Sequence, residues 1–149
     1  MPTNPYITGL DLTAQPPRSP KVKVGGFRIL GRTIDKCRAA LFGKIGEYHF
    51  DCPLDNSLFG WKGIRGADFK AYVAEGHSDE EIGEWVRAHG TARMPDEIAA
   101  WNDSVLKNNY ADDPEGQEWL QGQNVKLGIP KNSTLFDMLE ADDRASFKK

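Results

Sequence analysis

Side chains that can do chemistry are concentrated between residues 31 and 55 of this 149-residue chain. The segment holds both cysteines, one of the three histidines, four carboxylates, four cations and a tyrosine within 25 positions. A hydrophobic core does not need so many reactive groups, because fully buried residues are mostly apolar. We therefore expect a functional site in this segment.

Cys52 is the first candidate for a catalytic group. Pro53 fits the first position of a helix, so Cys52 is predicted at the N-cap, where free backbone N–H groups stabilise a thiolate. His49, three residues upstream, is a candidate base, whereas Asp51 and Asp55 oppose a further negative charge. The alternative is that Cys52 packs as a small apolar residue.

The other candidates are an acid–base set and a set that could hold an anion. Tyr48 could polarise a carbonyl group, and it joins Asp35, His49 and Cys52 as a candidate catalytic residue. The candidate ligand-binding residues are the cations and one acid of the same segment: Arg38, Arg32, Lys36 and Glu47. The alternative for Asp35 and Arg38 is an ion pair with each other. A single site requires these side chains to converge on one pocket.

We expect neither a metal nor a cofactor. Cys37, His49 and Cys52, with His77 or His89 as a fourth ligand, lack the closely spaced pairs that structural zinc sites use. The common nucleotide-binding, hydrolase and zinc-protease motifs are not present in the sequence. Cys37 falls on an apolar helical stripe, which favours a packing role for it.

Charge is distributed unevenly along the chain. Residues 18–44 contain eight cations and one acid, a net +7, so the remainder carries −10. Such a block can attract an anionic ligand, or it can dock against acidic parts of the same fold. Nucleic acid is disfavoured as a partner, because Phe27 and Phe42 are the only aromatic residues interleaved with these cations and both fit a core.

The hydrophobic period predicts an all-α fold, a compact bundle of about six short helices. We expect an irregular arm over 1–26, one helical domain over 27–143 and a tail over 144–149. Thr33 is a possible N-cap for a helix over 33–42. Further helices are expected at 54–59 and 67–75, after Ser78, from Pro95 and Pro114, and around 135–139.

Composition indicates a cytoplasmic protein. The first residues lack the cationic and apolar pattern of a signal peptide, and no apolar run is long enough to span a membrane. Two cysteines do not make a disulfide framework. The sequence carries no signal for a particular oligomeric state.

Several motifs resemble a known family. These are Ile34-Asp-Lys-Cys-Arg-Ala, Gly46-Glu-Tyr-His-Phe-Asp-Cys-Pro-Leu-Asp and Phe136-Asp-Met-Leu-Glu-Ala-Asp-Asp. They are similar to a family of small bacterial proteins catalogued as a domain of unknown function, with a match from about residue 10 to residue 143. The resemblance implies a bacterial origin and one domain, and it supplies no activity.

Together these features predict a protein that binds a small, anionic molecule at residues 31–55, either as a cofactor-independent enzyme or without catalysis. The alternative is a non-catalytic interaction module whose basic 18–44 segment contacts an acidic protein or nucleic acid.

Overall fold

The computed structural model describes residues 9–147, and within them it contains seven helices and no strand. The all-α prediction is therefore confirmed. The described chain forms two compact units, the first ending at Ile98 and the second beginning at Ala99, inside helix α6 (Pro95–Lys107). The prediction of one domain over 27–143 stays a prediction. No described helix is long and apolar enough to cross a membrane.

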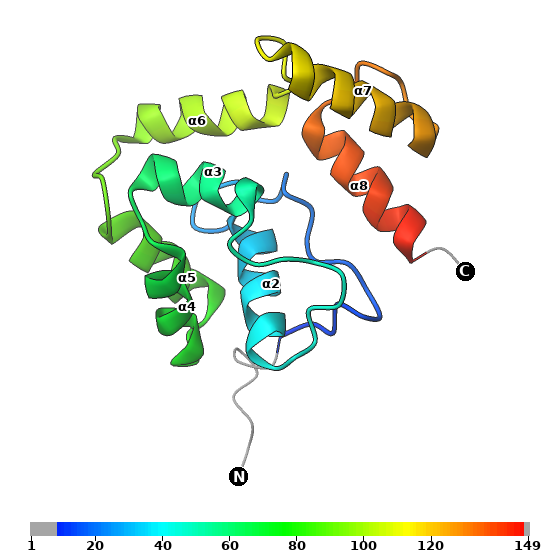
Figure 1. Ribbon diagram of the computed structural model, residues 1–149. Helices are drawn as coiled ribbons and strands as arrows, with labels where there is room; N and C mark the ends of the chain where they lie inside the picture. The colour runs from blue at the N-terminus through cyan, green and yellow to red at the C-terminus, as the bar shows by residue number, and fades with distance from the viewer. Residues whose placement is uncertain (1–8, 148–149) are drawn as a thin grey trace. The chain divides into compact units, whose positions relative to one another are not determined.

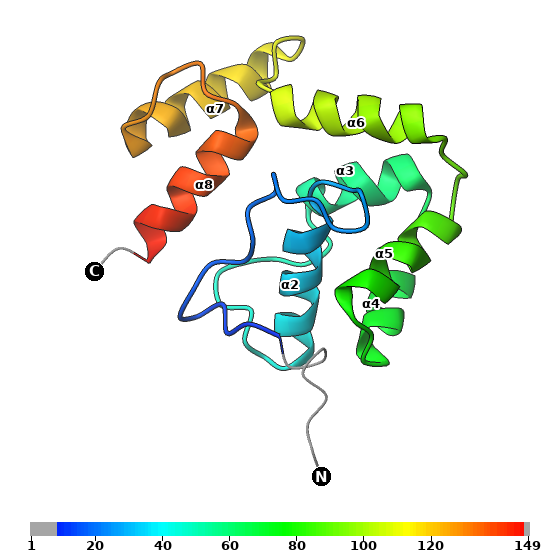
Figure 2. The same ribbon diagram turned by 180° about the vertical axis from the view of Figure 1, so that it is seen from behind.

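The first unit is built around helix α2 (Leu30–Leu41), which is buried along almost its whole length. Helices α3 (Pro53–Lys62), α4 (Gly66–Ala74) and α5 (Asp79–Ala88) surround it with the irregular segment before it (Figures 1 and 2). Their apolar faces form the core: Phe27, Leu30, Ile34, Cys37, Leu58, Phe59, Phe69, Val73, Ile82 and Val86. Because α2 is central, its polar side chains must also find buried partners.

Helix α2 begins three residues earlier than predicted, and the Thr33 cap is wrong. The N-cap is Ile29, which has a φ of 73° and gives no side-chain hydrogen bond to the helix. The chain enters α2 from a tight turn in which Val24 and Phe27 exchange backbone hydrogen bonds of 3.0 Å. Thr33 is therefore inside the helix, where its hydroxyl serves the site described below.

The starts of α3 and α5 follow their sequence signals. Pro53 opens α3, and Ser78 caps α5 by accepting a hydrogen bond of 3.2 Å from the Glu81 backbone. Between these helices, the amine of Lys62 is buried and donates to the carbonyls of Arg87, His89 and Thr91. This amine fixes the end of α3 against the loop that follows α5.

The second unit contains helices α7 (Pro114–Leu127) and α8 (Leu135–Ser146), which pack on each other (Figures 1 and 2). The buried amide of Asn124 donates to the carbonyls of Lys131 and Ser133, and this fixes the connecting loop. Thr134 caps α8 by accepting from the Asp137 backbone at 3.1 Å. Helix α8 runs to Ser146 and so includes residues that we expected in a tail.

Gly83 allows the turn before α2 to touch helix α5. A Cβ at Gly83 would lie 2.9 Å from the Cα of Gly25. We expect Gly83→Ala to cost about 1–3 kcal/mol, because backbone must move to relieve the overlap. Gly60→Ala in α3 is the matched control, since a Cβ there meets no atom within 4 Å. It should stabilise the protein by about 0.5–1 kcal/mol through helix propensity.

Urea unfolding of the two variants measures both free energies. Equal gains in stability would show that the turn and α5 do not approach as closely as the structure has them.

Candidate functional site

A buried polar cluster lies where α2 faces the start of α3, and its centre is the carboxylate of Asp55. One oxygen of this carboxylate is 3.0 Å from the amine of Lys36 and accepts a hydrogen bond of 2.6 Å from the hydroxyl of Thr33. The other oxygen accepts from the backbone N–H groups of Asp51 and Cys52. Asp55 is fully buried and Lys36 is 3% exposed, so this is a desolvated ion pair with additional hydrogen bonds.

Cys52 forms the solvent edge of this cluster. Its side chain is half-buried, and the amine of Lys36 donates to its Sγ at 3.2 Å. Cys52 has an extended conformation, with φ −82° and ψ 174°, and occupies the N-cap of α3 as predicted. We call Thr33, Lys36, Cys52 and Asp55 the thiol cluster.

The loop before α3 turns sharply at Asp51, which has a φ of 62°. The carboxylate of Asp51 approaches Gly66 at the start of α4, where any Cβ would lie 2.5 Å from it. This places a negative charge at a helix N-terminus, a favourable position. The Asp51 carboxylate also accepts a hydrogen bond of 2.9 Å from the side chain of Asn56.

Asp35 and Arg38 belong to a second cluster, on a different side of α2. The guanidinium of Arg18 donates to both carboxylate oxygens of Asp35, each at 3.0 Å, and to Asp79 at 2.8 Å. Arg38 donates to the other oxygen of Asp79 and to the carbonyl of His77, both at 2.9 Å. We call these four charged residues the arginine network.

The arginine network joins the irregular segment, α2 and α5 through alternating charges. Asp35 and Arg38 are nearly buried, and their charges are compensated by Arg18 and Asp79. Asp35 therefore pairs with Arg18 and not with Arg38. The sequence left open whether the basic segment binds an external anion or pairs with acids of the same fold. Arg18, Lys36 and Arg38 pair with acids inside the first unit.

The other four predicted site residues lie outside both clusters or at their borders. Arg32 is buried, donates to the carbonyl of Arg18 at 3.4 Å and places its guanidinium 5.4 Å from the centre of the Tyr48 ring. Glu47 and His49 are exposed on the loop between α2 and α3. No described hydrogen bond or ion pair connects His49 with Cys52. The eight predicted residues thus do not converge on a single site.

The two cysteines have opposite surroundings. Cys37 is completely buried on the apolar side of α2, as its stripe predicted, and burial is the main reason that its pKa is raised to about 12. A thiol with that pKa is almost entirely protonated at neutral pH and is inert. Cys52 is the thiol that solvent can reach.

Sequence reasoning missed four residues of these clusters, and one of them, Asp55, was considered only as a charge that opposes the thiolate. Thr33 was assigned to a helix cap, and Arg18 and Asp79 were not selected at all. The signal for Asp55 was present, since an acid three residues after an N-cap is typical of a capping box. No sequence signal indicates Arg18 and Asp79, because their partners are far away along the chain.

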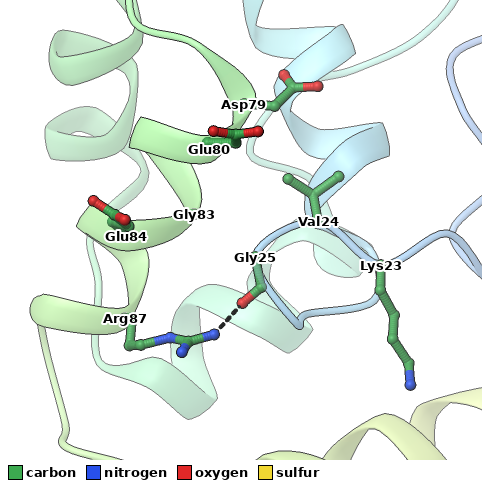
Figure 3. A pocket seen from close by; sticks show the side chains of 8 residues that line it. All are labelled: Lys23, Val24, Gly25, Asp79, Glu80, Gly83, Glu84 and Arg87. Atoms are coloured by element: carbon green, nitrogen blue, oxygen red, sulfur yellow. Dashed lines mark hydrogen bonds between the residues drawn. The ribbon is translucent and has the colours of Figure 1, made fainter.

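A cavity of about 500 Å³ lies beside the arginine network, and Asp79 is one of its lining residues (Figure 3). It is bounded by the turn before α2 and by α5, and Arg87 donates to the carbonyl of Gly25 at its edge. None of the eight predicted site residues lines it. Within residues 9–147, no group of three or more His, Cys, Asp or Glu side chains is placed to hold a metal ion.

The arginine network predicts a small loss of stability in acid. Burial alone would raise the pKa of the Asp79 carboxyl, but the hydrogen bonds and charges of Arg18 and Arg38 outweigh burial and lower it. A lowered carboxyl pKa stabilises the fold above the unfolded value of about 3.9, and this contribution is lost as pH falls through the folded value.

We therefore expect Asp79→Asn to lose less stability than the unchanged protein between about pH 5 and pH 3. Asp79 is partly exposed, so the difference should stay below about 1 kcal/mol. Urea unfolding at the two pH values measures it, and identical acid slopes would contradict the pairing of Asp79 with the two arginines.

The sequence of the chain matches the model of a known protein family. Residues 14–145 match the family model described as "Domain of unknown function (DUF5069)", and the chain belongs to this family. The match includes both clusters. No curated protein is significantly similar in sequence to the chain.

Proposed function

We propose that this protein acts on or binds a small molecule through the thiol of Cys52. The observation that supports this proposal is the hydrogen bond of 3.2 Å from the amine of Lys36 to the Sγ of Cys52 at the start of α3. An ammonium group and a helix N-terminus both favour the thiolate, which is the nucleophilic form of cysteine. Cys52 is half-buried, so a small molecule in solvent can reach it.

Each residue of the thiol cluster has a distinct part in this proposal. Cys52 is the nucleophile, and Lys36 stabilises its negative charge. Asp55 and Thr33 are positioning residues, because Asp55 fixes the amine of Lys36 and Thr33 donates to Asp55. Asp55 also offsets part of the charge of Lys36, so the direct hydrogen bond to sulfur is the main stabilising contact.

The proposed ligand is anionic, in keeping with the charge of the 18–44 segment, and Arg32 is the candidate to attract it. Asp35 and Arg38 are less suitable than the sequence suggested, because they already bond with Arg18 and Asp79. These ion pairs, together with that of Lys36 and Asp55, weigh against the alternative of an interaction module, since three of the cations that it requires have internal partners.

A pair of alkylating reagents tests the charge preference of the site. The Cys37→Ala protein leaves Cys52 as the single thiol, and it is treated with neutral iodoacetamide or with anionic iodoacetate. We expect the ratio of the iodoacetate rate to the iodoacetamide rate to be at least about threefold higher in the folded protein than in urea. Cys52→Ser in the same background is the labelling blank.

An equal or lower ratio in the folded protein would contradict an anionic ligand. The absolute alkylation rates would then show whether the thiol is reactive toward neutral molecules.

A further inference from the structure

Lys36 and Cys52 form a pair that oxidation could join covalently. The Lys36 side chain is 3% exposed, its nitrogen is 3.2 Å from Sγ, and Cys52 is the half-buried residue of the pair. A peroxide can therefore reach the sulfur, while the closest side-chain amine is already in contact with it. We propose that Cys52 is an oxidative modification site whose product is a sulfenamide with the side chain of Lys36.

The chemistry proceeds in two balanced steps. Hydrogen peroxide transfers one oxygen to Sγ, so the thiol becomes a sulfenic acid, the O–O bond breaks and one water is released. The nitrogen of Lys36 then attacks the sulfur, an S–N bond forms, and the S–O bond breaks with release of a second water. The sulfur is oxidised by two electrons in total, and the peroxide is reduced.

Asp55 completes the proton balance of the second step. Lys36 must lose its charge before its nitrogen can attack, and the Asp55 oxygen 3.0 Å away is the nearest acceptor for the proton. After the reaction the nitrogen is neutral and the carboxyl is protonated, so no unpaired charge remains in the buried cluster. The hydroxyl of Thr33 stays within hydrogen-bond distance of the same carboxyl.

The residue after the cysteine favours lysine as the nucleophile. A sulfenic acid can also condense with a backbone nitrogen, but the residue that follows Cys52 is Pro53, which has no N–H to lose. The buried position of Lys36 also prevents its amine from meeting any other sulfur in solution. The modification would block the thiol and cross-link the N-cap of α3 to α2.

Mass spectrometry of the Cys37→Ala protein tests the inference, because this variant cannot form a Cys37–Cys52 disulfide. After treatment with a few equivalents of hydrogen peroxide, we expect the intact chain to lose about 2 Da. Digestion without a reductant should yield one peptide pair that joins Lys36 to Cys52, and dithiothreitol should separate it. Trypsin should not cleave after Lys36 until the reductant is added.

Two controls assign the bond. Cys37→Ala with Lys36→Arg keeps the charge but removes the amine, so its chain should gain oxygen, by about 16 or 32 Da, and form no cross-link. Cys37→Ala with Cys52→Ser should show neither change and remains informative if the arginine variant does not fold. Oxygen addition at Cys52 with normal cleavage after Lys36, or a disulfide-linked dimer, would overturn the inference.

The inference goes beyond the proposed function and can fail separately from it. Alkylation is measured without peroxide, so a reactive Cys52 that gains only oxygen would retain the proposed function and refute the cross-link.

Discussion

Asp55→Asn should lower the free energy of unfolding by about 3–5 kcal/mol, the range typical of a broken buried ion pair. The substitution removes the charge that compensates Lys36, whose side chain is 3% exposed. It also replaces a carboxylate that has four hydrogen-bond or ion-pair partners with an amide that has one acceptor oxygen. Urea unfolding of the purified variant gives the value.

Asp142→Asn on the exposed side of α8 is the matched control and should change stability by less than about 0.5 kcal/mol. Adding Lys36→Met to Asp55→Asn should recover part of the loss, because the uncompensated buried charge is then absent. A loss below about 1 kcal/mol for Asp55→Asn would show that the thiol cluster is not desolvated.

Cys52 should be alkylated at least about 100-fold faster than Cys37 in the folded protein at pH 7. The pKa of Cys37 is raised to about 12, mainly by burial. Even a thiol with the ordinary value of about 8.5 has a thiolate population about a thousandfold larger. The rates are measured with iodoacetamide on the two single-cysteine variants, Cys37→Ala and Cys52→Ala.

The same two variants unfolded in urea supply the control, since both thiols should then react at similar rates. A folded-state ratio near one would mean that the apolar side of α2 opens to solvent or that Cys52 is covered.

The helices were largely predictable because their starts depend on local chemistry. Pro53 and Ser78 each satisfy or remove backbone N–H groups at a helix start, and a search of a few neighbouring residues finds them. The start of α2 was missed because it has no such local signal. Ile29 has no capping side chain and a φ of 73°, so tertiary packing and not local sequence sets this boundary.

The site was predictable only in part, because α2 presents its polar residues in more than one direction. Asp35 and Lys36 are neighbours in sequence, yet successive helical residues are rotated by about 100°. One therefore bonds to Arg18 and the other to Asp55. Some of the charged groups between residues 31 and 55 compensate one another's charge on a buried helix. A pattern of residue types alone does not distinguish such ion pairs from catalytic groups.

The rate of Cys52 alkylation tests the central claim most directly. Iodoacetamide rates are measured at pH 6.5 on Cys37→Ala, folded and in concentrated urea. If the amine of Lys36 and the start of α3 activate the sulfur as a nucleophile, the folded protein should react at least about tenfold faster than the unfolded chain. A folded protein that reacts no faster than the unfolded chain would show that Cys52 is a packing residue and would contradict the proposed function.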